Sequence, residues 1–181
     1  MRSLSASDWW SLVRFAHIFS SAVREILEQQ LFHEVSGNGL TLSQFHLLEF
    51  IALGDKRHQM LDVAAFLGVS TAAATKNVDK LQRLGLVNRK PFPGDRRVTL
   101  LSLSRKGRRV VEQYAEVEQK KLATVLHRFR SAELTTLARL LERCSIELVR
   151  AGGDAHAVCL RCAGHFDEEC SIRHLHAGCP Y

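Results

Sequence analysis

The sequence lacks the features that mark several common classes of protein. No stretch approaches the roughly 18 uncharged apolar residues of a membrane-spanning helix. The first ten residues, MRSLSASDWW, lack the apolar segment and small-residue cleavage site of a signal peptide. The sequence also has no internal repeat and no low-complexity tract. We therefore expect a cytoplasmic globular protein.

Familiar catalytic patterns are missing too. The sequence has no GxGxxG loop, and no pattern brings a Ser/His/Asp set or a pair of carboxylates together. An enzyme or an electron carrier is therefore the least favoured class. The composition itself is ordinary, with 46% hydrophobic and 24% charged residues among 181. These values fit one globular domain with an appendage.

The positive charge of the chain is concentrated in one block. The net charge is +6, but residues 70–109 carry eleven lysines and arginines against two aspartates, which leaves the rest of the chain acidic. Apolar residues interrupt this block at regular spacing, so it lies on folded structure. Such a basic block on a near-neutral body indicates nucleic-acid binding, and it disfavours a purely structural module.

Apolar residues at three- and four-residue intervals predict most of the helices. One helix is predicted over residues 8–35, capped by Ser7 or Asp8, and a second from about residue 43 to residue 54. A short third helix over 59–67 would turn four apolar side chains inward, namely Leu61, Ala64, Ala65 and Leu67. Ser70 would cap a fourth helix that ends at Gly85.

The second half of the chain predicts a hairpin followed by two helices. LVNRK (86–90) and VTLLSL (98–103) are rich in β-formers and are joined by the Pro/Gly turn PFPGDRR. A long helix follows from Ser104, and another from Ser131 to a Gly-Gly break at 152–153. A short helix, a tight GVS link, a second helix and a hairpin together form a winged helix-turn-helix.

The predicted fold is therefore mainly α: a winged helix-turn-helix with long N- and C-terminal dimerisation helices and a small β-hairpin wing. The predicted units are an N-terminal dimerisation helix (1–40), a DNA-binding domain (41–104), C-terminal dimerisation helices (105–152) and a Cys-rich tail (153–181). Dimerisation is expected because the apolar stripes of the three long helices are too wide for one winged unit to cover.

The fourth helix has the composition of a recognition helix. Small residues at 71–75 would let its backbone enter a major groove, and its N-terminus favours a phosphate. Val78, Leu81 and Leu84 would hold the opposite face on the core. The candidate DNA contacts on this helix are Ser70, Thr71, Ala72, Ala73, Thr75, Lys76, Asn77 and Lys80.

The hairpin tip, PGDRR, is the second candidate contact. Arg96 and Arg97 could enter a minor groove, and Asp95 would hold one of them by a charge-assisted hydrogen bond. Arg89 and Lys90, on the first predicted strand, complete the candidate set.

The stretch LGVSTAAATKNVDKLQRLGLVNRKPFPGDRRVTLLSLSRKG resembles the core of the MarR family of bacterial winged-helix regulators. The resemblance covers roughly residues 10 to 150. It implies a homodimer whose first and last two helices interlock, with the recognition helix in the major groove and the wing in the minor groove of a palindromic operator. It also implies a ligand crevice between the dimerisation helices and the DNA-binding unit. The sequence departs from the family at HQML, where no hydroxyl residue starts the third helix.

The tail, which lies beyond this resemblance, contains four of the five cysteines. Their spacing is C-x2-C-x7-C-x8-C, at Cys159, Cys162, Cys170 and Cys179. We favour a metal or cluster site in a reducing compartment, with a thiol switch or a disordered or modified tail as the alternatives. Cys144, among leucines of the last helix, is interpreted as a small buried hydrophobe.

The type of metal centre stays open between two candidates. Structural zinc usually takes two close cysteine pairs, and only CLRC is close here. Dispersed thiolates and a proline after the last cysteine favour an iron–sulfur cluster, with zinc as the alternative. Three histidines could replace a cysteine as ligand: His165, His174 and His176.

The leading hypothesis is a transcriptional regulator, a repressor, whose tail senses redox state, iron or nitric oxide. Cluster state would bias a dimer between DNA-competent and DNA-incompetent forms. The alternative is a regulator that responds to a small-molecule effector and carries a structural zinc in its tail.

Overall fold

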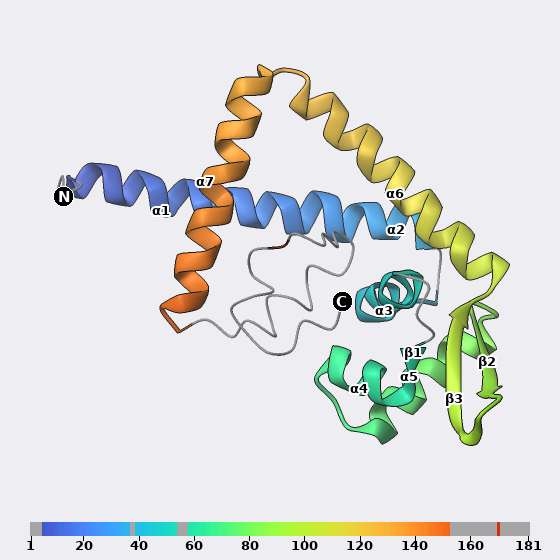
Figure 1. Ribbon diagram of the computed structural model, residues 1–181. Coiled ribbons are helices and arrows are strands. Elements are labelled where there is room, and N and C mark those ends of the chain that lie inside the picture. The colour runs from blue at the N-terminus through green and yellow to red at the C-terminus, as the bar shows by residue number, and fades with distance from the viewer. Residues whose placement is uncertain (1–4, 37–38, 54–57, 153–169, 171–181) are drawn as a thin grey trace.

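The computed structural model describes residues 5–36, 39–53, 58–152 and 170. The described chain is mainly helical with one small antiparallel sheet, which confirms the predicted fold class. Figure 1 shows a long N-terminal helical rod whose C-terminal end lies against the long helix that follows the sheet. None of the described helices is long and apolar enough to cross a bilayer.

The N-terminal rod consists of three successive helical segments. These are α1 (Ala6–Ala22), the π-helix η1 (Val23–Gln30) and α2 (Leu31–Ser36). The rod agrees with the single helix predicted over 8–35, apart from its π segment. The predicted cap is wrong, because Ser5 begins the helix and its Oγ accepts a hydrogen bond from the Asp8 backbone N–H at 3.2 Å.

Three helices form the centre of the predicted DNA-binding unit: α3 (Leu42–Ala52), α4 (Met60–Leu67) and α5 (Thr71–Arg83). The C-cap of α4 is Gly68, the first residue of the predicted GVS link, and its φ of 63° lies in the left-handed region that glycine adopts without steric cost. The predicted inward face of α4 is partly wrong. Leu61 is 70% exposed and Ala65 is exposed, while Val63 and Phe66 are buried beside Ala64.

The sheet contains β1 (His58–Gln59), β2 (Val87–Phe92) and β3 (Asp95–Leu103) in the order β1-β3-β2. The predicted hairpin is confirmed as β2 and β3, with Val87 opposite Leu103. The prediction missed β1, because two residues are too short to show an alternating pattern. His58 pairs with Leu101, which ties the start of α4 to the hairpin.

The chain leaves the hairpin through α6 (Arg105–Leu126) and returns through α7 (Ser131–Arg150). Ser104 caps α6, and its Oγ accepts a hydrogen bond from the Gly107 N–H at 3.0 Å. Gly107 is required by a close approach rather than by its φ: a Cβ there would lie 2.1 Å from the Leu86 carbonyl oxygen. The start of α6 is therefore pressed directly against the backbone that enters β2.

A small aromatic cluster joins the rod to the DNA-binding unit. Phe32 of α2, Phe45 of α3 and Tyr114 of α6 are buried together, and the ring centroids of Phe45 and Tyr114 are 4.5 Å apart. The Tyr114 hydroxyl donates to the Leu27 carbonyl of η1 at 2.8 Å. Near the other end of α6, Lys121 pairs with Glu34 at 3.2 Å. These contacts fix the C-terminal part of the rod on α3 and α6.

Candidate DNA-binding surface

The N-terminal end of α5 has the cap and the buried inner face that the sequence predicted. Ser70 is the N-cap, and its Oγ accepts a hydrogen bond from the Ala73 N–H at 3.3 Å. Val78 and Leu81 are fully buried on the inner face of the helix. Thr71 and Ala72 are exposed on the first turn. The helix therefore offers a narrow, small-residue end that another molecule can approach closely.

Two of the predicted cations of α5 lie away from its core face. Lys76 is exposed and Lys80 is half-buried, and both lie in the part of the helix that follows its small first turn. On the neighbouring hairpin, Lys90 of β2 is exposed as well. The structure thus brings lysines from two elements to the surface of one unit.

Other candidate residues are engaged within the protein. The Thr75 hydroxyl donates to the Thr71 carbonyl at 2.8 Å. The Asn77 side chain donates to the Ala73 carbonyl at 3.2 Å and accepts from Gln44 Nε2 of α3 at 3.3 Å. Both side chains therefore have internal roles that the sequence did not indicate.

Arg89 connects the hairpin to α5. Its Nη2 lies 2.6 Å from Asp79 Oδ1 and also donates to the Thr75 carbonyl at 3.5 Å. The side chain of Arg89 is 26% exposed and that of Asp79 is 45% exposed. This ion pair neutralises one positive charge of the basic block, and it joins β2 to the outer side of the recognition helix. Sequence reasoning counted Asp79 only as an opposing charge, because the two residues are ten positions apart on different elements.

The junction between α5 and α6 holds further polar contacts. The Ser104 hydroxyl donates to the Gly85 carbonyl at 2.6 Å, and Lys106 Nζ donates to the Leu84 carbonyl at 3.0 Å. A cation at the C-terminal end of a helix also interacts favourably with its dipole. Lys106 therefore stabilises the end of α5 and contributes less free charge than its place in the basic block suggests.

The hairpin tip projects at the end of the sheet (Figure 1). Asp95 is exposed and opens β3, where it pairs with Phe92 across a break in register after Pro91. Arg96 and Arg97 follow in β3, and the structure describes their backbone. The charge-assisted hydrogen bond expected between Asp95 and one of these arginines stays a prediction.

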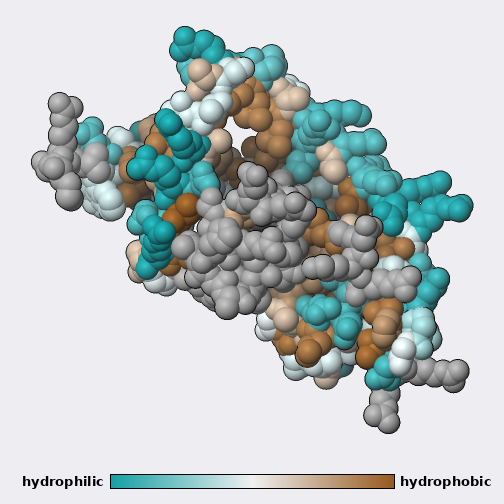
Figure 2. All heavy atoms as spheres, viewed as in Figure 1, coloured by the Kyte–Doolittle hydropathy of each residue, from teal (hydrophilic) through white to brown (hydrophobic). Residues whose placement is uncertain are grey.

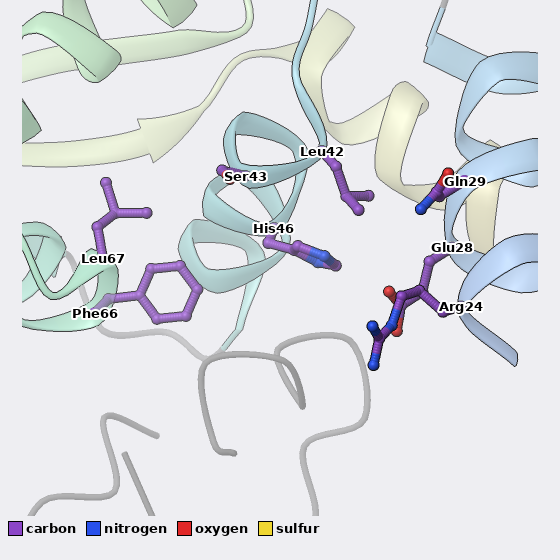
Figure 3. A pocket seen from close by; sticks show the side chains of 8 residues that line it. All are labelled: Arg24, Glu28, Gln29, Leu42, Ser43, His46, Phe66 and Leu67. Atoms are coloured by element: carbon purple, nitrogen blue, oxygen red, sulfur yellow. The ribbon is translucent and has the colours of Figure 1, made fainter. Parts of the chain in front are cut away.

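A pocket lies between η1, α3 and α4 (Figure 3), with a volume of about 310 Å³. Arg24 and Glu28 approach it from the rod, His46 from α3, and Phe66 and Leu67 from α4. The ring of His46 pairs with Glu49 of the same helix, 2.9 Å away. The pocket therefore combines an apolar wall with charged side chains, at the junction of the rod and the DNA-binding unit.

The predicted metal ligands fall largely outside the described residues: Cys159, Cys162, Cys179, His165, His174 and His176. Within the described ranges, no three His, Cys, Asp or Glu side chains gather as metal ligands. Cys170 is partly exposed and has a free thiol. Cys144 is an exposed free thiol on α7, so its interpretation as a buried hydrophobe is wrong for the single chain.

Comparison with known proteins identifies the winged unit. The model of the MarR family matches residues 38–98, which span α3 to the start of β3. The HTH-type transcriptional regulator YsmB of Bacillus subtilis (strain 168), itself uncharacterized, is 29% identical over 141 residues, covering 77% of this chain and 90% of that protein.

Solved structures share the architecture. RV1404 from Mycobacterium tuberculosis is 26% identical with a TM-score of 0.68, over 85% of this chain and 99% of that one. FabT from Streptococcus pneumoniae, solved in complex with DNA, is 18% identical with a TM-score of 0.65, over 80% of this chain and 99% of that one. The family and the relatives are transcriptional regulators and not enzymes. These similarities support a MarR-type winged helix-turn-helix DNA-binding transcriptional regulator.

Proposed function

We propose that the protein binds a palindromic operator as a homodimer and represses transcription from it. The observation that carries this proposal is the outer surface of α5, where exposed small residues precede Lys76 and Lys80 while the opposite face is buried. A helix with this surface fits a major groove, and the neighbouring wing fits the adjacent minor groove. FabT, which shares the fold, was solved in complex with DNA.

The apolar surface of the long helices supports the dimer. Large apolar side chains of α1 are exposed, among them Trp9 at 52% and Leu12 at 56%. Figure 2 shows apolar surface around the opening between α6 and α7. Exposed apolar side chains on these two helices and the link between them include Val125, Leu126, Phe129, Leu137, Leu140, Leu141 and Leu148. A large exposed apolar surface marks an interaction site, and a second copy would bury the same faces symmetrically.

Selection of duplexes from a randomised DNA library by the purified full-length chain tests the proposal. We expect enriched sequences with two inverted half-sites about 10 base pairs apart, because a two-fold dimer places its recognition helices about one DNA turn apart. A reporter driven by the enriched duplex should be transcribed less when the protein is present. If no sequence were enriched at low ionic strength, operator binding would be refuted.

We further propose that the tail binds an iron–sulfur cluster through Cys159, Cys162, Cys170 and Cys179. The donor set supports this: four thiols within 21 residues match the ligand chemistry of such clusters, and of structural zinc as the alternative. The tail directly follows α7, so a centre there could alter how the dimer helices cross. Cluster loss would then change the spacing of the recognition helices and report on redox state, iron or nitric oxide.

Absorption spectroscopy and metal analysis of anaerobically purified protein test the tail. A coloured protein with iron and visible absorption supports the cluster. A colourless protein with one zinc per chain would show that the tail binds structural zinc and not a cluster. Absence of both metals would exclude a metal centre and leave a thiol switch or a disordered tail.

The pocket between η1, α3 and α4 supports a second candidate function, regulation by a small-molecule effector. Its volume of about 310 Å³ suits a small ligand, and Arg24 and His46 provide polar contacts beside the apolar Phe66. In this case the tail would hold a structural zinc, and the effector would act at the junction of the rod and the DNA-binding unit.

A further inference from the structure

A hydrogen-bonded side-chain link connects α3 to the recognition helix. Gln44 is 6% exposed, and its Nε2 donates to Asn77 Oδ1 of α5 at 3.3 Å. Asn77 Nδ2 in turn donates to the Ala73 carbonyl, on the first turn of α5, at 3.2 Å. The link therefore joins two elements that are 33 residues apart and ends at the part of α5 that is expected to meet DNA.

Gln44 is itself held in place. Its Oε1 accepts from the Thr41 backbone N–H at 3.1 Å, and the Thr41 hydroxyl accepts from the Gln44 backbone N–H at 3.3 Å. This reciprocal cap fixes the side chain at the start of α3. A buried amide with both its oxygen and its nitrogen bonded has one favourable orientation, so it can define the position of the residue it contacts.

Asn77 is correspondingly poorly placed to read bases. Base recognition by an asparagine needs its amide oxygen and nitrogen together. Here the oxygen accepts from Gln44 and the nitrogen donates to Ala73. A base contact that displaced Gln44 would leave the Nε2 of that buried side chain without its bond to Asn77.

We propose that Gln44 and Asn77 are positioning residues that set the orientation of α5 and so determine the discrimination between operator and random DNA. The inference rests on the proposed operator binding. Direct readout depends on side chains that reach base edges with good geometry, whereas phosphate attraction tolerates a shifted helix. Loss of the link therefore weakens specific binding and leaves random-sequence binding and its salt dependence unchanged.

A double-mutant cycle with Gln44→Met and Asn77→Ala tests the proposal. The readout is the ratio of the dissociation constants for a random duplex and for the duplex selected by the wild-type protein. We expect each single variant to lower this ratio roughly fivefold per bound subunit, the value of one ordinary hydrogen bond. The double variant should lose no more than either single one, because both changes break the same link.

Thr41→Ala is the matched control. It removes the hydroxyl cap of α3 but leaves the bond between Gln44 and Asn77, so it should lower the thermal midpoint and leave the ratio unchanged. Gln44→Glu is the second variant, should Gln44→Met fail to fold, because it keeps the oxygen that accepts from Thr41 and loses the donor to Asn77. It should lower the ratio like Gln44→Met.

Three outcomes would overturn the proposal. If only Asn77→Ala lowered the ratio, Asn77 would read DNA directly. If the two variants acted multiplicatively, they would contribute independently. If Thr41→Ala lowered the ratio equally, helix stability and not the link would be responsible. Failure of the wild-type protein to select any duplex is a separate result, and it refutes the operator binding itself.

Discussion

Replacement of Lys76 by alanine should reduce the salt dependence of DNA binding. Lys76 is an exposed cation on α5 and contacts a phosphate in the proposed complex. Each phosphate contact contributes about 0.9 to the slope of log affinity against log salt, so the loss of two contacts per dimer reduces the slope by about 1.8. Between 50 and 200 mM salt, the wild-type affinity should therefore fall about twelvefold more than that of the variant.

The ion pair between Arg89 and Asp79 provides the matched comparison. The double variant Arg89→Gln, Asp79→Asn removes one positive and one negative charge, so the net charge is unchanged. Because Arg89 Nη2 is already bonded to Asp79 at 2.6 Å, we expect the salt slope to stay at the wild-type value. The partly exposed pair contributes only about 1 kcal/mol, after screening by solvent, to the free energy of unfolding.

Fluorescence anisotropy with a labelled duplex, at five or more salt concentrations, measures both slopes. An unchanged slope for Lys76→Ala would show that this face of α5 does not meet phosphates. A reduced slope for the double variant would show that Arg89 leaves Asp79 and contacts DNA. Either result would contradict the conclusion that Lys76 is free to contact DNA while Arg89 is held by Asp79.

Three further predictions follow from the structure. Gly107→Ala should lower the free energy of unfolding in urea by at least about 2 kcal/mol, because the new Cβ would lie 2.1 Å from a backbone carbonyl oxygen. Burial raises the pKa of Tyr114 above its ordinary value of 10.0, so the folded state disfavours the phenolate. Stability should then fall as pH rises above about 10, and Tyr114→Phe should remove this part of the decline in thermal melts between pH 8 and 11. Cys159→Ser with Cys162→Ser should abolish bound iron and visible absorption, while Cys144→Ser should retain both; equal loss in the two proteins would contradict the assignment of the ligands.

Local signals in the sequence predicted much of the winged unit. Ser70 and Gly68 have side-chain and backbone preferences that act within a few residues, so the start of α5 and the end of α4 could be placed from them. The Pro/Gly turn predicted the hairpin for the same reason. Val78 and Leu81 were assigned to the core from their helical spacing, and both are fully buried.

The features that the sequence did not predict depend on tertiary contacts. The two residues of β1 form a strand only because β3 lies beside them. The bonds from Gln44 to Asn77 and from Arg89 to Asp79 join different elements, and no local pattern marks either pair. As a result, charge counting did not reveal that Arg89 is paired with Asp79, and the internal bonds of Asn77 were not foreseen.

The long helices expose apolar side chains in the single chain. Their periodicity predicts apolar stripes too wide for one winged unit to cover. Trp9 and Phe19 are about half exposed, at 52% and 50%. Cys144 on α7 is exposed for the same reason. These positions are the ones at which the proposed second copy would complete the core.

The most direct test of the central claim is the stoichiometry of the complex with a selected duplex, measured by analytical ultracentrifugation at low ionic strength. We expect two chains on one duplex that carries two inverted half-sites, and no stable complex with a duplex that carries one. A single chain bound with full affinity to a single half-site would contradict it.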